Sequence, residues 1–147
     1  MIEIDAEQAL MELGAMVARA ANLAPVLEII GQSEVENTRA RIQQSKTNPW
    51  GGDWAPWAES TEASRQRKGN AGQGLLWDDG DLLDSIHFKV DAMEGIGWVD
   101  IGSDLDYALY LQDGTEKMPA RPFLGWNDAP LAFYEAMMAN YVQTGIP

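Results

Sequence analysis

The segment Met118–Trp126, which reads Met-Pro-Ala-Arg-Pro-Phe-Leu-Gly-Trp, constrains the fold of this chain more than any other stretch. Pro119 and Pro122 fix their own φ at about −65° and bias the residue before each of them toward extended conformations, which predicts a stiff, non-helical strap. Three large apolar side chains stand in its second half: Phe123, Leu124 and Trp126. Burial of each contributes roughly 1.5–3 kcal/mol, so we expect the strap to be clamped onto a core or onto a neighbouring subunit.

Arg121 is the one charged residue of this strap. A planar guanidinium between two prolines is suited to hold a carboxylate through two parallel hydrogen bonds, and we expect that role for it. The pattern is equally typical of a proline-bearing loop that simply leads into a helix, and that alternative stays open.

The charge balance limits the classes of partner. The 147 residues include 23 acidic and 10 basic side chains, for a formal net charge of −13. Duplex DNA is bound mainly by Lys and Arg, so a sequence-specific DNA-binding protein is disfavoured, and a surface that repels DNA or meets a basic partner is favoured. The chain has no cysteine, which excludes disulfides, zinc–thiolate sites and thiol nucleophiles.

The length predicts a single domain over residues 1–147. The first seven residues are acidic and lack the basic leader of a secretory signal, and no apolar run approaches the roughly 18 residues that span a bilayer. We therefore expect a soluble chain that is made in the cytoplasm and has no membrane partner.

The N-terminal third predicts two helices. Apolar residues recur at helical spacing over 5–21, Asn-Leu-Ala-Pro at 22–25 interrupts them, and a second apolar series continues to residue 45. We expect the two helices to form a hairpin. Gly31 and Ser33 leave open an alternative in which the second helix is split.

A tryptophan loop follows at residues 48–57, Asn-Pro-Trp-Gly-Gly-Asp-Trp-Ala-Pro-Trp. Its glycines and prolines exclude regular secondary structure, yet indoles are costly to leave in water, so the loop is expected to be ordered. An aromatic platform for a sugar or a nucleobase would come with basic residues, and only Lys46 is near, so docking of the tryptophans into a protein surface is favoured. The loop and the strap together supply the candidate interface residues: Trp50, Trp54, Trp57, Arg121, Phe123, Leu124 and Trp126.

The remaining patterns predict an α+β fold with N-terminal helices, a small antiparallel β-sheet and a C-terminal helix. A polar helix at 59–68, a turn at 78–81 that starts another helical turn, and a strand hairpin at 86–90 and 98–101 precede a final helix at 128–142. Residues 107–111 fit a short helix or a third strand. The domain then divides into a helical part (1–46), a Trp/Gly-rich loop region (47–77), a β part (78–126) and the C-terminal helix (127–147).

The β part is the acidic pole of the chain, with nine acidic residues against Lys89 alone between positions 78 and 106. Six aspartates form a candidate DNA-repelling surface: Asp78, Asp79, Asp81, Asp84, Asp104 and Asp106. A calcium-binding loop counted from Asp79 fails, because Leu83 and Asp84 stand where a ligand and a glycine are required. Turn and cap chemistry explains these aspartates, and no metal or cofactor is expected.

His87, the only histidine, lies within a predicted strand and has no Ser or Asp partner motif, so we expect a structural role for it. No phosphate-binding glycine loop, nucleophile elbow or zinc spacing occurs in the sequence, and no enzymatic activity is expected. Catalysis of glycoside chemistry by a pair of carboxylates stays open as an alternative. In a chain this acidic some pair of carboxylates always lies close together, so the pattern gives no evidence for it.

Nine short motifs follow one another along almost the whole chain. They are Arg39, Arg41 and Gln43; Gly52–Pro56; Leu75-Leu76; Gly80–Ile86; Ile101–Ser103; Tyr107-Ala108; Gln112; Gly114; and Pro119–Gly125. In this order they resemble the phage virion morphogenesis family, the tail completion proteins of contractile-tailed phages that include the Mu-like group. The Pro-Ala-Arg-Pro-Phe-Leu-Gly run is the most specific of them.

The resemblance implies a non-catalytic assembly protein that acts in tail completion and head–tail joining, at the neck or the head-proximal end of the tail. It implies self-association into a ring, with sixfold order as one option, and docking to tail tube, tail terminator or connector proteins. DNA is then expected to pass without specific binding, aided by repulsion from the acidic β part, and rigid aromatic side chains suit the interfaces of rings. The implied location is the tail or neck of the virion, after assembly in the host cytoplasm.

Two other functions remain as alternatives to this one. An acidic inhibitor that mimics DNA would bind a nucleic-acid enzyme and compete with DNA for it. A small hydrolase would use paired aspartates and would lose activity when they are replaced. We favour the assembly function over both.

Overall fold

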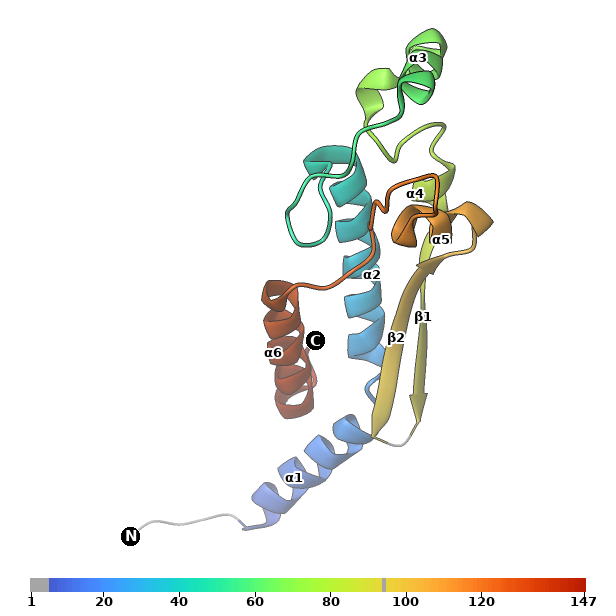
Figure 1. Ribbon diagram of the computed structural model, residues 1–147. Helices are drawn as coiled ribbons and strands as arrows, with labels where there is room; N and C mark the ends of the chain where they lie inside the picture. Colours follow the sequence, from blue (N-terminus) through green and yellow to red (C-terminus); the bar gives the residue numbers. More distant parts are fainter. Residues whose placement is uncertain (1–5, 94) are drawn as a thin grey trace. The chain divides into compact units, whose positions relative to one another are not determined.

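The computed structural model describes residues 6–93 and 95–147, and within that part the chain has the predicted α+β fold (Figure 1). Two antiparallel strands, β1 (Ile86–Met93) and β2 (Ile96–Ser103), form the sheet. The helices are α1 (Ala6–Ala21), α2 (Ala24–Ala40), α3 (Glu59–Lys68), α4 (Asp81–Ser85), α5 (Asp106–Asp113) and α6 (Asp128–Thr144). Residues 107–111 therefore belong to a helix and not to a third strand.

The described residues group into two compact units. Unit 1 comprises residues 6–31, residues 89–100 apart from 94, and residues 128–147, while unit 2 comprises residues 32–88 and 101–127. Helix α2 and both strands thus contribute to each unit. None of the described helices is on its own long and apolar enough to cross a membrane; one bent pair, α1 with Ala24–Ser45, meets that test by length and composition only.

The predicted helical hairpin at the N-terminus is wrong. Helices α1 and α2 meet at a bend of 49°, and α2 is not split at Gly31 or Ser33. The reason lies in the hydrogen bonds of the connection Asn22-Leu23, which close α1 and cap α2 with little change of chain direction. The Asn22 backbone nitrogen donates to Arg19 O at the end of α1. The Asn22 side-chain oxygen accepts from the backbone nitrogen of Ala24, the first residue of α2.

The core of unit 1 lies where α2, α6 and the hairpin meet. Its buried side chains are Val26, Leu27, Ile30, Tyr134 and Tyr141, with Val90 and Val99 of the strands packed against them. The Tyr141 hydroxyl donates to Asn22 O at 3.1 Å. A Cβ on Gly97 would lie 2.5 Å from the Leu27 methyl group, so β2 approaches α2 as closely as glycine allows.

The core of unit 2 combines the second half of α2, the π-helical turn Arg41–Ser45 that continues it, α4, α5, the start of β1 and three loop segments. Its buried residues are Val35, Ile42, Trp54, Leu76, Leu82, Leu83, Ile86, Ala108 and Phe123. Arg39 fastens α2 to the α4–β1 junction, because its guanidinium donates to Leu83 O at 2.9 Å and to Ile86 O at 3.0 Å. Two members of this core, Trp54 and Phe123, come from the tryptophan loop and the strap.

Candidate functional site

The strap is clamped onto the core of unit 2, as one of the two sequence-based expectations had it. Phe123 is 1% exposed and packs within that core, while Leu124 is half-buried against it. The backbone nitrogen of Arg121 donates to Leu111 O at 2.7 Å, which ties the start of the strap to α5. The strap is therefore a structural element of this chain's own fold.

Gln112 of α5 holds the strap as a neighbouring β-strand would. Its Oε1 accepts from the backbone nitrogens of Phe123 and Leu124, each at 3.1 Å, and its Nε2 donates to Leu124 O at 2.9 Å. One amide side chain thus satisfies three backbone groups of a segment whose prolines and bends exclude it from a sheet. Periodicity gave no signal for this role; the family motif was the one sequence feature that marked the residue.

Replacing Gln112 by alanine is expected to lower the free energy of unfolding by about 1–3 kcal/mol, because two backbone N–H groups and one carbonyl lose their partner. Urea denaturation followed by tryptophan fluorescence measures this. Gln66→Ala on the exposed face of α3 is the matched control and should change stability by no more than about 0.5 kcal/mol. Equal stability of the two variants would contradict the clamping role.

Arg121 does not hold a carboxylate, which corrects the sequence-based expectation. Its Nε donates to Ala55 O and its Nη2 to Pro56 O, both at 2.7 Å, and the residue is only 5% exposed. Two successive carbonyls of the tryptophan loop offer the same paired acceptors as a carboxylate, in a loop whose prolines leave carbonyls without ladder partners. Desolvation by burial lowers the pKa of Arg121, yet a guanidinium stays charged in proteins.

Further side chains bind successive carbonyls of the strap. The Trp54 indole nitrogen donates to Pro122 O at 2.7 Å, and Arg41 Nη1 donates to Phe123 O at 2.7 Å. Desolvation lowers the pKa of Arg41, and the nearby charge of Glu34 opposes that shift. With Gln112 on Leu124 O, three consecutive carbonyls each receive a separate side-chain donor, which rigidifies the strap from Pro122 onward.

The candidate interface residues therefore separate into three groups, of which three residues are buried, two are half-buried and two are exposed. Trp54, Arg121 and Phe123 are buried in unit 2 and supply no free surface, because the loop and the strap use them to bind each other. Trp57 is half-buried: its indole nitrogen donates to Leu75 O at 3.1 Å, and the Arg65 guanidinium lies 4.9 Å from its ring centroid.

Trp50 and Trp126 remain at the surface, with exposed fractions of 61% and 42%. They lie together, because the Trp50 indole nitrogen donates to Trp126 O at 3.1 Å. The Asn127 side chain donates to Pro49 O at 3.0 Å and a Cβ on Gly125 would touch Pro49 and Trp50, so the loop and the strap are in close contact here as well. The result is an exposed aromatic pair on a fixed backbone.

Five of the six aspartates of the predicted acidic surface line a pocket and a groove of unit 2. Asp78, Asp79 and Asp81 belong to a pocket of about 280 Å³, and Asp104 and Asp106 belong to a groove of about 580 Å³ beside α5. Asp84 is exposed on α4. Whether these carboxylates face DNA stays a prediction.

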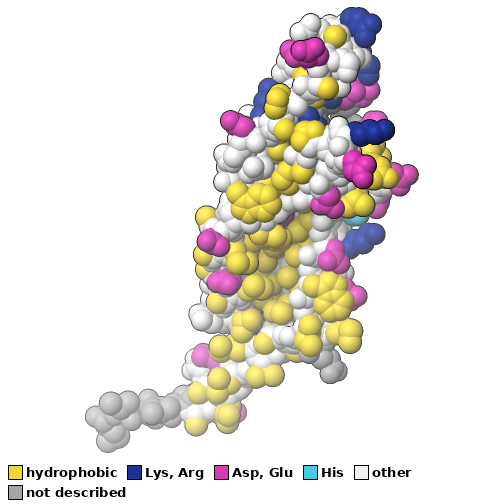
Figure 2. Space-filling view, in the orientation of Figure 1, with side chains coloured by type: hydrophobic (Ala, Val, Ile, Leu, Met, Phe, Trp, Pro, Cys, Tyr) yellow, Lys and Arg dark blue, Asp and Glu magenta, His cyan; other side chains and the backbone are white. Residues whose placement is uncertain are grey.

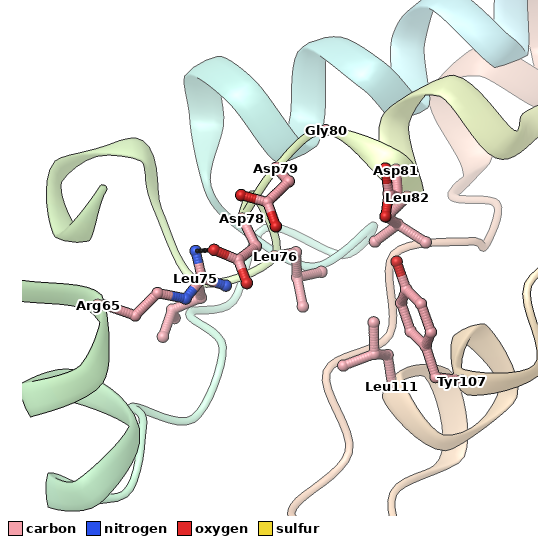
Figure 3. Close-up of a pocket in the computed structure, with 10 residues that line it drawn as sticks. All are labelled: Arg65, Leu75, Leu76, Asp78, Asp79, Gly80, Asp81, Leu82, Tyr107 and Leu111. Carbon is pink, nitrogen blue, oxygen red and sulfur yellow. Dashed lines mark ion pairs between the residues drawn. The ribbon is translucent and has the colours of Figure 1, made fainter. Parts of the chain in front are cut away.

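In the pocket Asp78 is paired with Arg65 (Figure 3). At one end Asp78 lies 3.3 Å from Arg65 Nη1 and 3.4 Å from Lys68 Nζ, and at the other end the Tyr107 ring rises toward Asp81 and Leu82. Desolvation alone would raise the pKa of Asp78, but the Asn70 hydrogen bond and the charges of Arg65 and Lys68 outweigh it, so the pKa is lowered. Desolvation, followed by the charges of Asp81, Asp78 and Asp79, raises the pKa of Tyr107.

The two ring nitrogens of His87 face a backbone oxygen and a carboxylate. Its Nδ1 lies 3.0 Å from the backbone oxygen of Ser85, while its Nε2 lies 3.6 Å from Asp104. The Ser85 hydroxyl instead donates to Leu82 O and contacts Ser103. Within the part of the chain that the structure describes, no group of three His, Asp or Glu side chains is placed to hold a metal ion.

The fold and this site define a class of protein: a small α+β chain that uses buried arginine and tryptophan and a half-buried glutamine to fix its own backbone, and that exposes large apolar side chains of the kind found at interaction sites. The chain belongs to the phage virion morphogenesis family, whose model matches residues 4–143. This confirms the resemblance and assigns a structural role in phage assembly to a virion-associated protein. Comparison with curated proteins and with solved structures gave no match.

Proposed function

We propose that this chain is a non-catalytic virion protein that acts in tail completion and in joining head to tail, at the neck or the head-proximal end of the tail. The family match over residues 4–143 carries the proposal. The chain assembles in the host cytoplasm, forms a ring with further copies of itself, and docks to tail tube, tail terminator or connector proteins.

The exposed pair Trp50 and Trp126 is the part of unit 2 best suited to docking. Tryptophan is enriched among the residues that dominate binding energy, and an anchor on a fixed backbone loses little conformational entropy when it is bound. The Trp50 indole and the Asn127 side chain bind the backbone at the pair, and Gln112 fixes the strap two residues before Trp126. We infer that these two indoles insert into an apolar surface of a tail or connector protein.

The acidic residues of the pocket and the groove support the proposal that DNA passes this protein without being bound. Asp79 and Asp104 are mostly exposed, and a surface with net charge −13 repels phosphate. A chain that lets DNA pass should neither bind duplex DNA nor compete for a DNA-binding enzyme. Competition with DNA would favour the DNA-mimic alternative.

Loss of the gene product tests the proposal. In the phage that encodes this chain, an early stop codon in its gene should give DNA-filled heads and separate tails in electron micrographs, and wild-type protein from a plasmid should restore joined particles. Normal particle yield without the protein, or a defect in DNA replication alone, would overturn it.

The double variant Trp50→Ala/Trp126→Ala tests the docking surface. Two anchors worth about 2 kcal/mol each predict binding to purified tails about 1,000-fold weaker. The free energy of unfolding should fall by no more than about 1 kcal/mol, because the Trp50 indole gives up its hydrogen bond to Trp126 O. Sedimentation with tails measures the binding. Tyr110→Ala is the control, because Tyr110 is an exposed aromatic residue of the same unit. Tail binding as tight as that of the wild type would remove the pair from the interface.

A further inference from the structure

Helix α1 presents its apolar face to water. Its 16 residues include none that is buried, and residues 6–15 are all exposed. Leu10, Leu13 and Val17 lie on one helical face with exposed fractions of 56–69%, and Met11 beside them is similarly exposed. Figure 2 shows hydrophobic side chains over most of this helix.

The contacts of α1 explain why this face is outward. The Arg19 guanidinium donates to Val142 O and Gln143 O, both at 2.7 Å, and Gly95 N donates to Ala21 O. All three contacts engage the last turn. Arg19 projects from the side of the helix opposite Val17 and Leu10, and Met16 and Ala20 line an apolar groove with α6. The anchored side of α1 therefore differs from the side that carries the exposed stripe.

The polar side of α1 argues against a membrane as the occupant. Its first three turns carry Glu7, Gln8 and Glu12 and no cation, while the one cation of the helix, Arg19, is bound to α6. Interfacial membrane helices carry Lys and Arg on the polar face, because these attract anionic lipid. A protein surface is the favoured partner.

A second exposed apolar patch lies on the strand hairpin of unit 1. Val90 and Val99 face the core, so the alternate positions face outward, and there Met93, Ile96 and Trp98 are exposed. Two residues separate the strands, which sets Met93 opposite Ile96 on that outer face. An outer sheet face is ordinarily polar, so this patch is as unusual as the α1 stripe.

We propose that the α1 stripe of one copy (Leu10, Met11, Leu13 and Val17) packs on the hairpin patch of a second copy (Met93, Ile96 and Trp98). Two different patches on one chain give a heterologous contact that repeats from copy to copy, and the copies form a closed ring when the rotation between neighbours divides a full turn. The stripe and the patch expose on the order of 500 and 400 Å² of apolar surface, against the roughly 1,200–2,000 Å² that a stable interface buries in total. The two apolar surfaces together supply most of the smallest area that a stable interface buries, and the polar residues around them supply the remaining area.

This inference rests on the proposed function for the ring and adds the surfaces that form it. The chain has no cysteine, so single cysteines can report the contact. A mixture of Val17→Cys and Ile96→Cys proteins, treated with a short bismaleimide, should yield the mixed dimer several-fold more efficiently than Val17→Cys with Leu109→Cys. Leu109 is a matched control, because it is an equally exposed apolar residue on α5 of unit 2.

Light scattering provides the second readout. The wild type should form a defined oligomer, and Leu10→Gln/Leu13→Gln/Val17→Gln should have the mass of one chain with an unchanged circular dichroism spectrum. Leu109→Gln should keep the wild-type mass. A monomeric wild type, a triple variant that still assembles, or equal cross-linking with the control position would overturn the inference.

Binding to lipid vesicles tests the alternative that the α1 stripe contacts a membrane and not a second copy. Flotation of the wild type, but not the triple variant, with vesicles of phosphatidylcholine and phosphatidylglycerol would assign the stripe to lipid and overturn the inference. The tail-binding and rescue experiments on the wild type test the proposed function, whereas the cross-linking tests only the contact between copies. Wild-type rescue with equal cross-linking at both positions would overturn this contact and leave the proposed function standing.

Discussion

Phe123→Ala is expected to lower the free energy of unfolding by about 3–5 kcal/mol, which is the usual cost of removing a fully buried phenylalanine. The side chain is 1% exposed and lies in the core of unit 2, so its loss leaves a cavity that the surrounding residues cannot fill. Three side chains fix the strap backbone around it, which limits relaxation and places the expected loss toward the upper end. Urea denaturation with circular dichroism as the readout measures it.

Phe133→Ala is the matched control for that experiment. Phe133 is 59% exposed on α6, and its truncation should change stability by no more than about 0.5 kcal/mol. If the ring contact with Tyr134 were important for the fold, the control would itself lose stability. A Phe123→Ala protein as stable as the control would mean that the strap is not part of the core in solution.

Arg121→Ala is expected to cost about 3 kcal/mol. The guanidinium supplies two charge-assisted hydrogen bonds to Ala55 O and Pro56 O, each worth about 1.5–3 kcal/mol, and its removal leaves both carbonyls in a buried place. Arg121→Lys should recover only part of the loss, because one ammonium cannot satisfy both acceptors with the geometry of the fork. Arg67→Ala on exposed α3 should have little effect.

Salt distinguishes this arrangement from the carboxylate pairing that the sequence suggested. The partners of Arg121 are neutral carbonyls, so the loss caused by Arg121→Ala should be nearly the same at low and at high ionic strength. A loss that shrinks markedly with added salt would reveal an acidic partner. Unfolding measured in two salt concentrations decides between them.

The sequence predicted those helices, strands and loops whose conformation is set by residues close to one another along the chain. The prolines of the strap, the alternation at residues 86–90 and the apolar series at 128–142 report directly on backbone conformation, and the structure has these elements. The ends of helices were less certain, since α6 continues to Thr144 beyond the predicted residue 142.

The partners of side chains could not be predicted in the same way. Arg121, Arg41 and Gln112 bind backbone carbonyls and amides, and every residue has those groups, so nothing in the sequence marks the acceptor. The sequence-based prediction therefore assigned a carboxylate to Arg121, because acidic side chains can be identified in a sequence and a particular backbone carbonyl cannot. The hairpin of α1 and α2 was wrong for a related reason: amphipathic spacing tells that a face is apolar and does not tell what covers it.

The chain passes from one unit to the other four times, after residues 31, 88, 100 and 127. The first three passages lie within α2, β1 and β2, so they run through regular secondary structure and not through loops. A protease cut after any one residue from 32 to 126 would therefore leave each product with pieces of both units. Neither unit can be expressed as one uninterrupted fragment, and we expect limited proteolysis to yield nicked protein that holds together until it is denatured.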